Sequence, residues 1–163
     1  MASSTENTKL TSYNNLRIPK SQVVVVYTEW NHEIIDELRK GVHTILNTFD
    51  QIELIEIEVP GCFEIPHVIA RHAQKYQAQA YIALGCIIKG ETPHFDFVAK
   101  GVTEGIMQLN LQLASPTIFG ILTVHTTEQA KERLGGKHGH KGEEAAIAAL
   151  KLININNEFN KTP

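Results

Sequence analysis

The stretch Gln22-Val-Val-Val-Val-Tyr27 decides the fold class, because a short β-branched run without polar alternation predicts a strand buried on both faces. A helical stretch follows from Asn31. Its apolar residues recur every three or four positions on one helix face: Ile34, Leu38, Val42 and Ile45. A doubly buried strand followed by an amphipathic helix is the unit from which parallel α/β sheets are built.

The same alternation continues along the chain. Further strands are expected at 51–59, 80–85 and 117–124, and further helices at 64–76, from about 93 to 113, at 126–134 and at 143–154. Four strand–helix repeats imply a parallel sheet with helices on both faces. The predicted fold is therefore a three-layer α/β/α sandwich with a four-stranded parallel sheet, of the flavodoxin-like type.

Length and composition indicate one domain. The chain has 163 residues, 42% of them hydrophobic, close to the prior of about 150 residues per domain. We assign residues 22–163 to the α/β domain. Residues 1–21 are polar and rich in Ser, Thr and Asn, and we expect a flexible arm there rather than a secretory signal.

Charge and cysteine usage exclude several classes of partner. The net charge is −3, so no basic excess is available to neutralise nucleic-acid phosphates. No apolar run approaches the roughly 20 residues that a membrane span requires. Cys62 and Cys86 lie far apart in the sequence without the spacing of metal ligands, which is typical of a reduced, cytoplasmic protein.

In parallel α/β sheets a ligand binds beyond the carboxyl ends of the strands. The segments that follow the expected strands are therefore the candidates for a site: Thr28–Asn31, Pro60–Glu64, Gly85–His94 and Thr123–Thr127. Lys89-Gly-Glu-Thr-Pro-His94 is the most informative stretch, because it joins a strand to a helix. The N–H groups of Glu91 and Thr92 at a helix start favour a phosphate. The alternative is that Thr92 only caps the helix that Pro93 begins.

His94 follows in the first helical turn, where imidazole can move protons at neutral pH. The helix N-terminus disfavours its charged form. The alternative is an ordinary surface histidine, one of eight in the chain. His138-Gly-His140 resembles a metal pair, but no third ligand lies near it, and we predict no metal site.

Other side chains also have two interpretations. Trp30 either belongs to the core or stacks on a planar heterocycle. Phe63 either packs in the core or lies with Cys62 and Glu64 around a polar ring. Arg133, with Lys141 near it, either belongs to a solvated loop or binds a phosphate.

Three stretches together resemble one family: 59–66 (VPGCFEIP), 85–96 (GCIIKGETPHFD), and 119–142 with its FGILT, Arg133 and GKHGHKG elements. The family is 6,7-dimethyl-8-ribityllumazine synthase, and the resemblance runs from about Gln22 to Leu152. It implies a transferase of riboflavin biosynthesis that condenses 5-amino-6-(D-ribitylamino)uracil with 3,4-dihydroxy-2-butanone 4-phosphate. Imine formation, phosphate elimination and ring closure complete the reaction, and no cofactor is implied.

The resemblance also implies a role for each matching residue. His94 corresponds to the proton-transfer residue. The phosphate-binding positions correspond to Glu91, Thr92, Arg133 and Lys141. The positions that bind the pyrimidine and its ribityl chain correspond to Trp30, Cys62, Phe63, Glu64, Cys86, Ile87, Ile88 and Phe119.

Assembly is implied as well, because the family takes the residues at Phe119 and Arg133 from a neighbouring subunit. We therefore expect a homo-oligomer: a pentamer, or a sixty-subunit icosahedral shell built from pentamers. The arm at 1–21 would pair with a neighbour's sheet edge. Two other functions stay open from the sequence: a flavodoxin-like module that binds a ligand without chemistry, and a purely structural shell.

Overall fold

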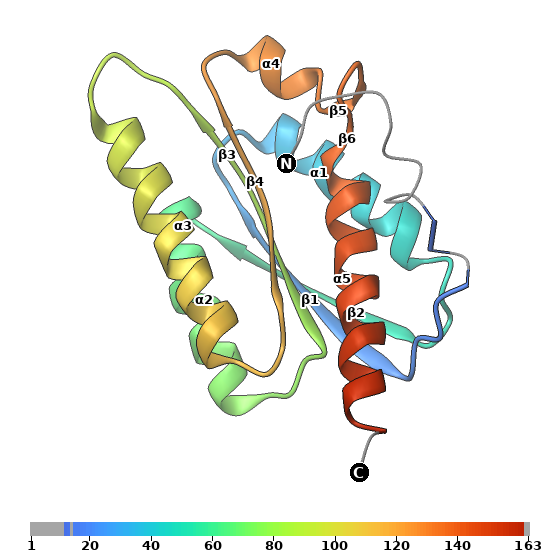
Figure 1. Cartoon of the computed structure of the whole chain (residues 1–163). Coiled ribbons are helices and arrows are strands. Elements are labelled where there is room, and N and C mark those ends of the chain that lie inside the picture. The colour runs from blue at the N-terminus through green and yellow to red at the C-terminus, as the bar shows by residue number, and fades with distance from the viewer. Residues whose placement is uncertain (1–11, 14, 162–163) are drawn as a thin grey trace.

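The computed structural model describes residues 12–13 and 15–161 (Figure 1). The helices and strands, in chain order, are β1 (Ser21–Thr28), α1 (His32–Leu46), β2 (Ile52–Val59), the 3-10 turn η1 (Cys62–Glu64), α2 (Ile65–Lys75), β3 (Ala80–Ile88), α3 (His94–Gln112), β4 (Thr117–Val124), α4 (Thr127–Lys131), β5 (Leu134–Gly136), β6 (Gly139–His140) and α5 (Lys141–Phe159).

The central sheet has four parallel strands in the order β2-β1-β3-β4. Helices α1 and α5 cover one face, and α2 and α3 cover the other (Figure 1). The predicted three-layer α/β/α sandwich is therefore confirmed.

Strand β1 explains why both faces must be covered. Val23 and Val25 belong to the cluster beneath α1 and α5, whereas Val24 and Val26 belong to the cluster beneath α2 and α3. All four valines are almost fully buried. Successive side chains of a strand point to opposite faces, so an unbroken apolar run requires two apolar layers around it.

The two long helices, α3 and α5, are each buried along one face. Helix α3 places Val102, Ile106 and Leu109 in the core, while Phe97 and Leu111 stay 72% and 80% exposed. Within the described part of the chain, no helix has both the length and the apolar character needed to cross a bilayer.

The structure corrects the predicted boundaries of three elements. Strand β3 continues past residue 85 to Ile88, because its pairing with β4 continues to Ile88 and Val124. The helix predicted to reach residue 134 ends at Lys131, and an antiparallel β5–β6 hairpin follows, with positive φ at Gly135 and Gly139. Helix α5 begins at Lys141 rather than 143 and extends to Phe159 rather than to about 154.

Residues 12–13 and 15–20 form no helix or strand, yet they are anchored. Tyr13, Leu16 and Ile18 pack against the cluster beneath α1 and α5. The Gln51 side-chain amide donates a hydrogen bond to the Ile18 carbonyl at 3.0 Å. Most of the predicted arm lies at 1–11 and 14, outside the described residues, so its pairing with a neighbour stays a prediction.

An ion pair ties α1 to the outer strand β2. Arg39 Nε donates to Glu56 Oε1 at 2.9 Å, and its guanidinium lies 4.1 Å from the centre of the Tyr27 ring on β1. This hydrogen bond to Arg39 is the main reason why the pKa of Glu56 lies below its usual value. A lowered carboxyl pKa stabilises the folded state above the unfolded pKa, and this stabilisation disappears as pH falls through the folded value.

We therefore expect Glu56→Gln to lower the free energy of unfolding at pH 7, with the difference from wild type shrinking as pH falls below about 4. Urea denaturation at a series of pH values measures this. Glu58→Gln, at an exposed position on the same strand, is the matched control and should follow the wild-type curve. A constant difference at every pH would contradict the role given to the ion pair.

Candidate active site

A cleft of about 620 Å³ lies at the carboxyl ends of β1 and β3. Four segments build it: the β1–α1 junction, η1, the end of β3 and the start of α3. Its lining residues are Trp30, Asn31, Gly61, Cys62, Phe63, Glu64, Cys86, Ile87, Ile88, Gly90, Thr92, His94, Phe95, Phe97 and Val98. The structure therefore brings nine of the predicted site residues to one place.

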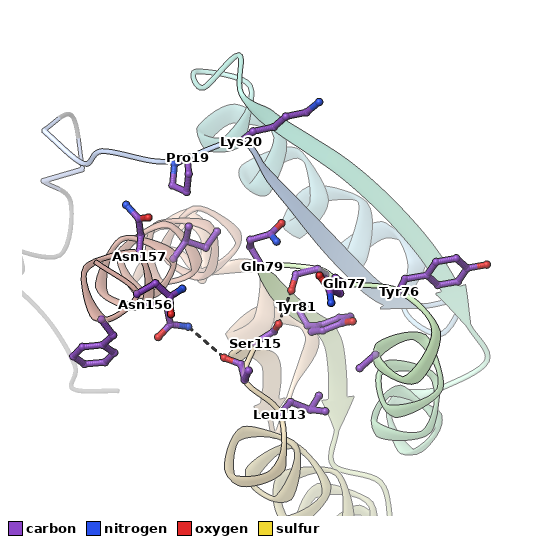
Figure 2. A pocket seen from close by; sticks show the side chains of 16 residues that line it. Pro19, Lys20, Tyr76, Gln77, Gln79, Tyr81, Leu113, Ser115, Asn156 and Asn157 are labelled. Atoms are coloured by element: carbon purple, nitrogen blue, oxygen red, sulfur yellow. Dashed lines mark hydrogen bonds between the residues drawn. The ribbon is translucent and has the colours of Figure 1, made fainter. Parts of the chain in front are cut away.

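A second cavity, of about 680 Å³, lies at the opposite end of the sheet. Figure 2 shows its amide-rich lining, which includes Gln77, Gln79 and Asn156, beside Tyr76 and Tyr81. None of the predicted site residues lines it. The predicted site residues that line a cavity therefore all lie at the smaller cleft.

The indole of Trp30 is 73% exposed and stands at the cleft, so it does not belong to the core. The Thr28 hydroxyl donates to the Trp30 carbonyl at 3.2 Å, which holds the backbone that carries the ring. A Cβ at Gly61 would lie 4.0 Å from Trp30 Cδ1 and 3.1 Å from Glu64 Oε2. Gly61 therefore keeps open the space between the indole and the Glu64 carboxylate.

The turn η1 presents its three residues differently. Cys62 is buried, whereas Phe63 and Glu64 are exposed at the cleft. Cys62 Sγ occupies the space that a Cβ at Gly85 would need. The Phe63 ring lies against α3, where a Cβ at Gly101 would come within 2.6 Å of it. Two glycines thus let η1 approach both the sheet and α3.

The two cysteines serve as walls rather than nucleophiles. Both are free, and they lie on opposite faces of the sheet, since Cys86 packs with the α1–α5 side and Cys62 with the α2–α3 side. Burial raises the pKa of the Cys62 thiol to about 12 and that of Cys86 to about 11. Both thiols therefore stay protonated at neutral pH, and the thiolate is the reactive form.

The loop before α3 offers unpaired donors. Helix α3 begins at His94 with Pro93 at the capping position, and no side chain caps it. The alternative that Thr92 serves as the cap is therefore wrong. Within 12–13 and 15–161, the N–H groups of Gly90, Glu91 and Thr92 have no backbone partner. Thr92 and His94 are exposed and line the cleft, whereas exposed Glu91 does not line it.

Besides Glu91, three predicted residues lie outside the cleft of their own chain. Phe119 is half-buried against the α2–α3 cluster. Arg133 Nη1 donates to the Gln129 carbonyl at 2.7 Å. Lys141 Nζ donates to both carboxylate oxygens of Glu144, at 2.7 and 2.8 Å. These three residues need another role or another chain's cleft.

The histidines around the hairpin have local partners. His140 Nδ1 accepts a hydrogen bond from the Glu143 N–H at 3.4 Å and so caps α5, and its ring fills the space above Gly41. His138 Nε2 lies 3.5 Å from the Glu132 carboxylate. Both imidazoles therefore interact with residues of their own chain.

A model of the 6,7-dimethyl-8-ribityllumazine synthases matches residues 20–157, most of the chain. The chain belongs to this family. A 6,7-dimethyl-8-ribityllumazine synthase of Porphyromonas gingivalis is 45% identical over 136 residues, covering 82% of this chain and 84% of its own. The synthase of Parabacteroides distasonis is 38% identical over 95% of this chain and 99% of its own. That of Cytophaga hutchinsonii is 45% identical over 79% and 82%.

Four residues with side chains line the cleft although the sequence does not mark them as site residues: Asn31, Phe95, Phe97 and Val98. Phe95 and Val98 share the apolar stripe of α3 with Val102, and such a stripe predicts burial rather than binding, whereas Phe97 lies off that stripe. Asn31 falls within the candidate segment Thr28–Asn31, but the sequence indicates no role for it beyond opening the helix. Its unusual backbone, described below, leaves no mark in a periodicity pattern.

The packing of Cys62 on Gly85 predicts a coupled pair of substitutions. Gly85→Ala should lower the free energy of unfolding by about 1–3 kcal/mol, because the new methyl group overpacks the site. Cys62→Ala in the same chain should restore most of that loss, since Sγ is what the methyl group meets. Chemical denaturation of both single variants and the double variant measures the coupling.

Gly90→Ala is the control for the added methyl group, because nothing lies within 4 Å of the Cβ it would introduce. Its stability should stay close to that of the wild type. Strictly additive effects of Gly85→Ala and Cys62→Ala would contradict the contact.

Proposed function

We propose that this chain condenses 5-amino-6-(D-ribitylamino)uracil with 3,4-dihydroxy-2-butanone 4-phosphate to give 6,7-dimethyl-8-ribityllumazine. One observation carries the proposal: a single cleft holds an exposed indole, unpaired N–H donors at a helix start, and His94. An aromatic plane suits the pyrimidine, and donors at a helix start suit the phosphate. An exposed imidazole beside both suits the proton transfers that join the two substrates.

In this assignment the pyrimidine stacks on Trp30 and faces the wall formed by Cys86, Ile87 and Ile88. The turn Cys62–Glu64 faces the ribityl chain, with the exposed Glu64 carboxylate available to accept hydrogen bonds from hydroxyl groups. Glu91 and Thr92 provide N–H donors for the phosphate, and the Thr92 hydroxyl adds a further donor.

The reaction depends more on holding the two substrates in position than on a strong nucleophile from the protein. The amine of the pyrimidine attacks the ketone carbon, and loss of water gives an imine. Elimination of phosphate and ring closure with loss of a second water complete the lumazine. Holding amine and ketone in contact replaces a bimolecular encounter. His94 takes up and returns the protons that these steps release.

Among the residues that the structure describes, no Lys or Arg lines the cleft of one chain. A phosphate ester carries up to two negative charges and is bound best by guanidinium or ammonium groups. Arg133 and Lys141, which lie outside their own chain's cleft, are suited to complete a neighbour's. We accordingly propose that Phe119, Arg133 and Lys141 act in the cleft of an adjacent copy.

The surface of α3 supports such an assembly. Phe97, Met107 and Leu111 are 72%, 58% and 80% exposed and recur along one side of the helix. Exposed apolar side chains of this size are typical of protein–protein contacts, and here the exposed Lys100–Glu104 pair lies between Phe97 and Met107. We propose a homo-oligomer, a pentamer or a sixty-subunit shell of pentamers, located in the cytoplasm, where unpaired cysteines such as Cys62 and Cys86 persist.

His94→Ala should lower kcat by about 10²- to 10⁴-fold without abolishing product formation, because proximity still operates when the proton carrier is gone. The appearance of lumazine absorbance after the two substrates are mixed measures this. His67→Ala, at an exposed position on α2, should match wild type. Unchanged turnover in His94→Ala would remove that histidine from the mechanism. Substrate binding without product in wild type would instead indicate a binding module.

The proposed assembly predicts particle size. Light scattering at two protein concentrations should give at least five times the 18.2 kDa chain mass. Met107→Asp with Leu111→Asp should reduce that mass and lower turnover in parallel, because charges are costly in an apolar contact and the cleft needs its neighbour. Thr103→Asp, at another exposed position of α3, is the control. A fully active monomer would contradict the shared site.

A further inference from the structure

Asn31, between β1 and α1, has an unusual backbone. Its φ of 60° and ψ of 41° lie in the left-handed region, and no other non-glycine residue in the described part of the chain has a positive φ. Side chains other than that of glycine are strained in this region, although Asn tolerates it better than most. Such a conformation persists only where neighbouring contacts hold it.

The side chain of Asn31 does not do what its position suggests. An Asn at a helix N-cap normally accepts a hydrogen bond from the first turn through its side chain. Here the backbone carbonyl of Asn31 accepts from the N–H groups of Ile34 and Ile35, at 2.9 and 3.1 Å, and the side chain makes no capping bond. Asn31 Nδ2 instead donates to the Cys86 carbonyl on β3, at 2.9 Å.

The sheet explains why Cys86 needs this donor. The ladder between β1 and β3 ends at the pair Tyr27 and Leu84, whereas β3 continues beside β4 as far as Ile88. Beyond Leu84, β3 therefore has no strand on the side of β1. The Asn31 amide bonds to a carbonyl that β1 no longer reaches, and it joins the two walls of the cleft across this gap.

We infer that Asn31 is a positioning residue that sets the spacing between Trp30 and the Cys86–Ile88 wall. Trp30 directly precedes Asn31, so the backbone turn at Asn31 fixes the position of the Trp30 backbone from which the indole extends. The hydrogen bond from Asn31 to Cys86 then fixes the distance between this backbone and β3. The inference rests on the proposed function, in which the pyrimidine lies between these two walls. Asn31 would therefore govern affinity for the pyrimidine and leave the phosphate substrate unaffected.

Two substitutions distinguish the contribution of the Asn31 backbone conformation from that of its side-chain hydrogen bond. Asn31→Gly keeps the left-handed backbone accessible but removes the donor, and it should raise KM for the pyrimidine about tenfold, the effect of one lost hydrogen bond. Asn31→Asp keeps the shape but sets a carboxylate against the Cys86 carbonyl, and it should raise this KM further. In both variants kcat and KM for the phosphate substrate should stay within about twofold of wild type.

A second measurement reports on position without substrate. Trp30 is the only tryptophan in the chain, so the emission of ligand-free protein comes from the indole at the cleft. Both variants should shift this emission or change its quenching by acrylamide. A raised KM with unchanged emission would mean that Asn31 contacts the substrate directly, and would overturn the positioning role.

Asn110 provides a matched control at the other end of the sheet. Its side chain also bonds a strand backbone, donating to the Thr117 carbonyl at 2.9 Å and accepting from the Thr117 N–H at 2.8 Å. Asn110→Asp should lower the thermal midpoint while leaving KM and Trp30 emission unchanged. Asn31 variants that match wild type in KM would overturn the inference, whereas a wild type without turnover would instead overturn the proposed function.

Discussion

The separation of β1 from β3 is the feature on which the whole site depends. The two strands pair as far as Tyr27 and Leu84, and from there to Ile88 β3 pairs with β4 but no longer with β1. The chain leaving β1 turns away into α1 and leaves a gap, with Trp30 on one side and the end of β3 on the other. Parallel sheets place such gaps at the carboxyl ends of their strands, where helix starts also supply unpaired donors.

Close packing around the gap makes it a defined cleft rather than an open groove. Gly85 allows Cys62 to lie directly on the sheet, and Gly101 and Gly105 allow Phe63 and Pro66 to lie on α3. Each contact needs a residue without Cβ, because the Cys62 thiol, the Phe63 ring or the Pro66 ring occupies the space. The walls are therefore fixed by packing, while the polar groups that would meet substrate remain exposed.

The layers of the fold could be predicted because the apolar pattern of a doubly buried strand such as β1 has few solutions. The β5–β6 hairpin could not, since its strands are three and two residues long and depend on positive φ at Gly135 and Gly139. Six site residues could be assigned to the cleft from segments that follow strands: Trp30, Cys62, Phe63, Glu64, Thr92 and His94. Cys86, Ile87 and Ile88 came from the family resemblance. The hydrogen bond from Asn31 to the Cys86 carbonyl could not be predicted, because the two residues lie 55 positions apart in the sequence.

The side-chain charges that line the cleft of one chain do not suit a phosphorylated substrate. The lining contains Glu64 but no Lys or Arg, so an isolated chain would present an acidic side chain and no fixed cation to a phosphorylated substrate. Unpaired N–H groups at the start of α3 offset part of that repulsion, but their partial charge falls short of a phosphate dianion. Arg133 already donates to a backbone carbonyl through Nη1, which leaves its other N–H groups for a ligand. In the proposed assembly, Arg133 of an adjacent copy would supply the cation that the cleft lacks, so phosphate affinity and association would depend on the same contacts.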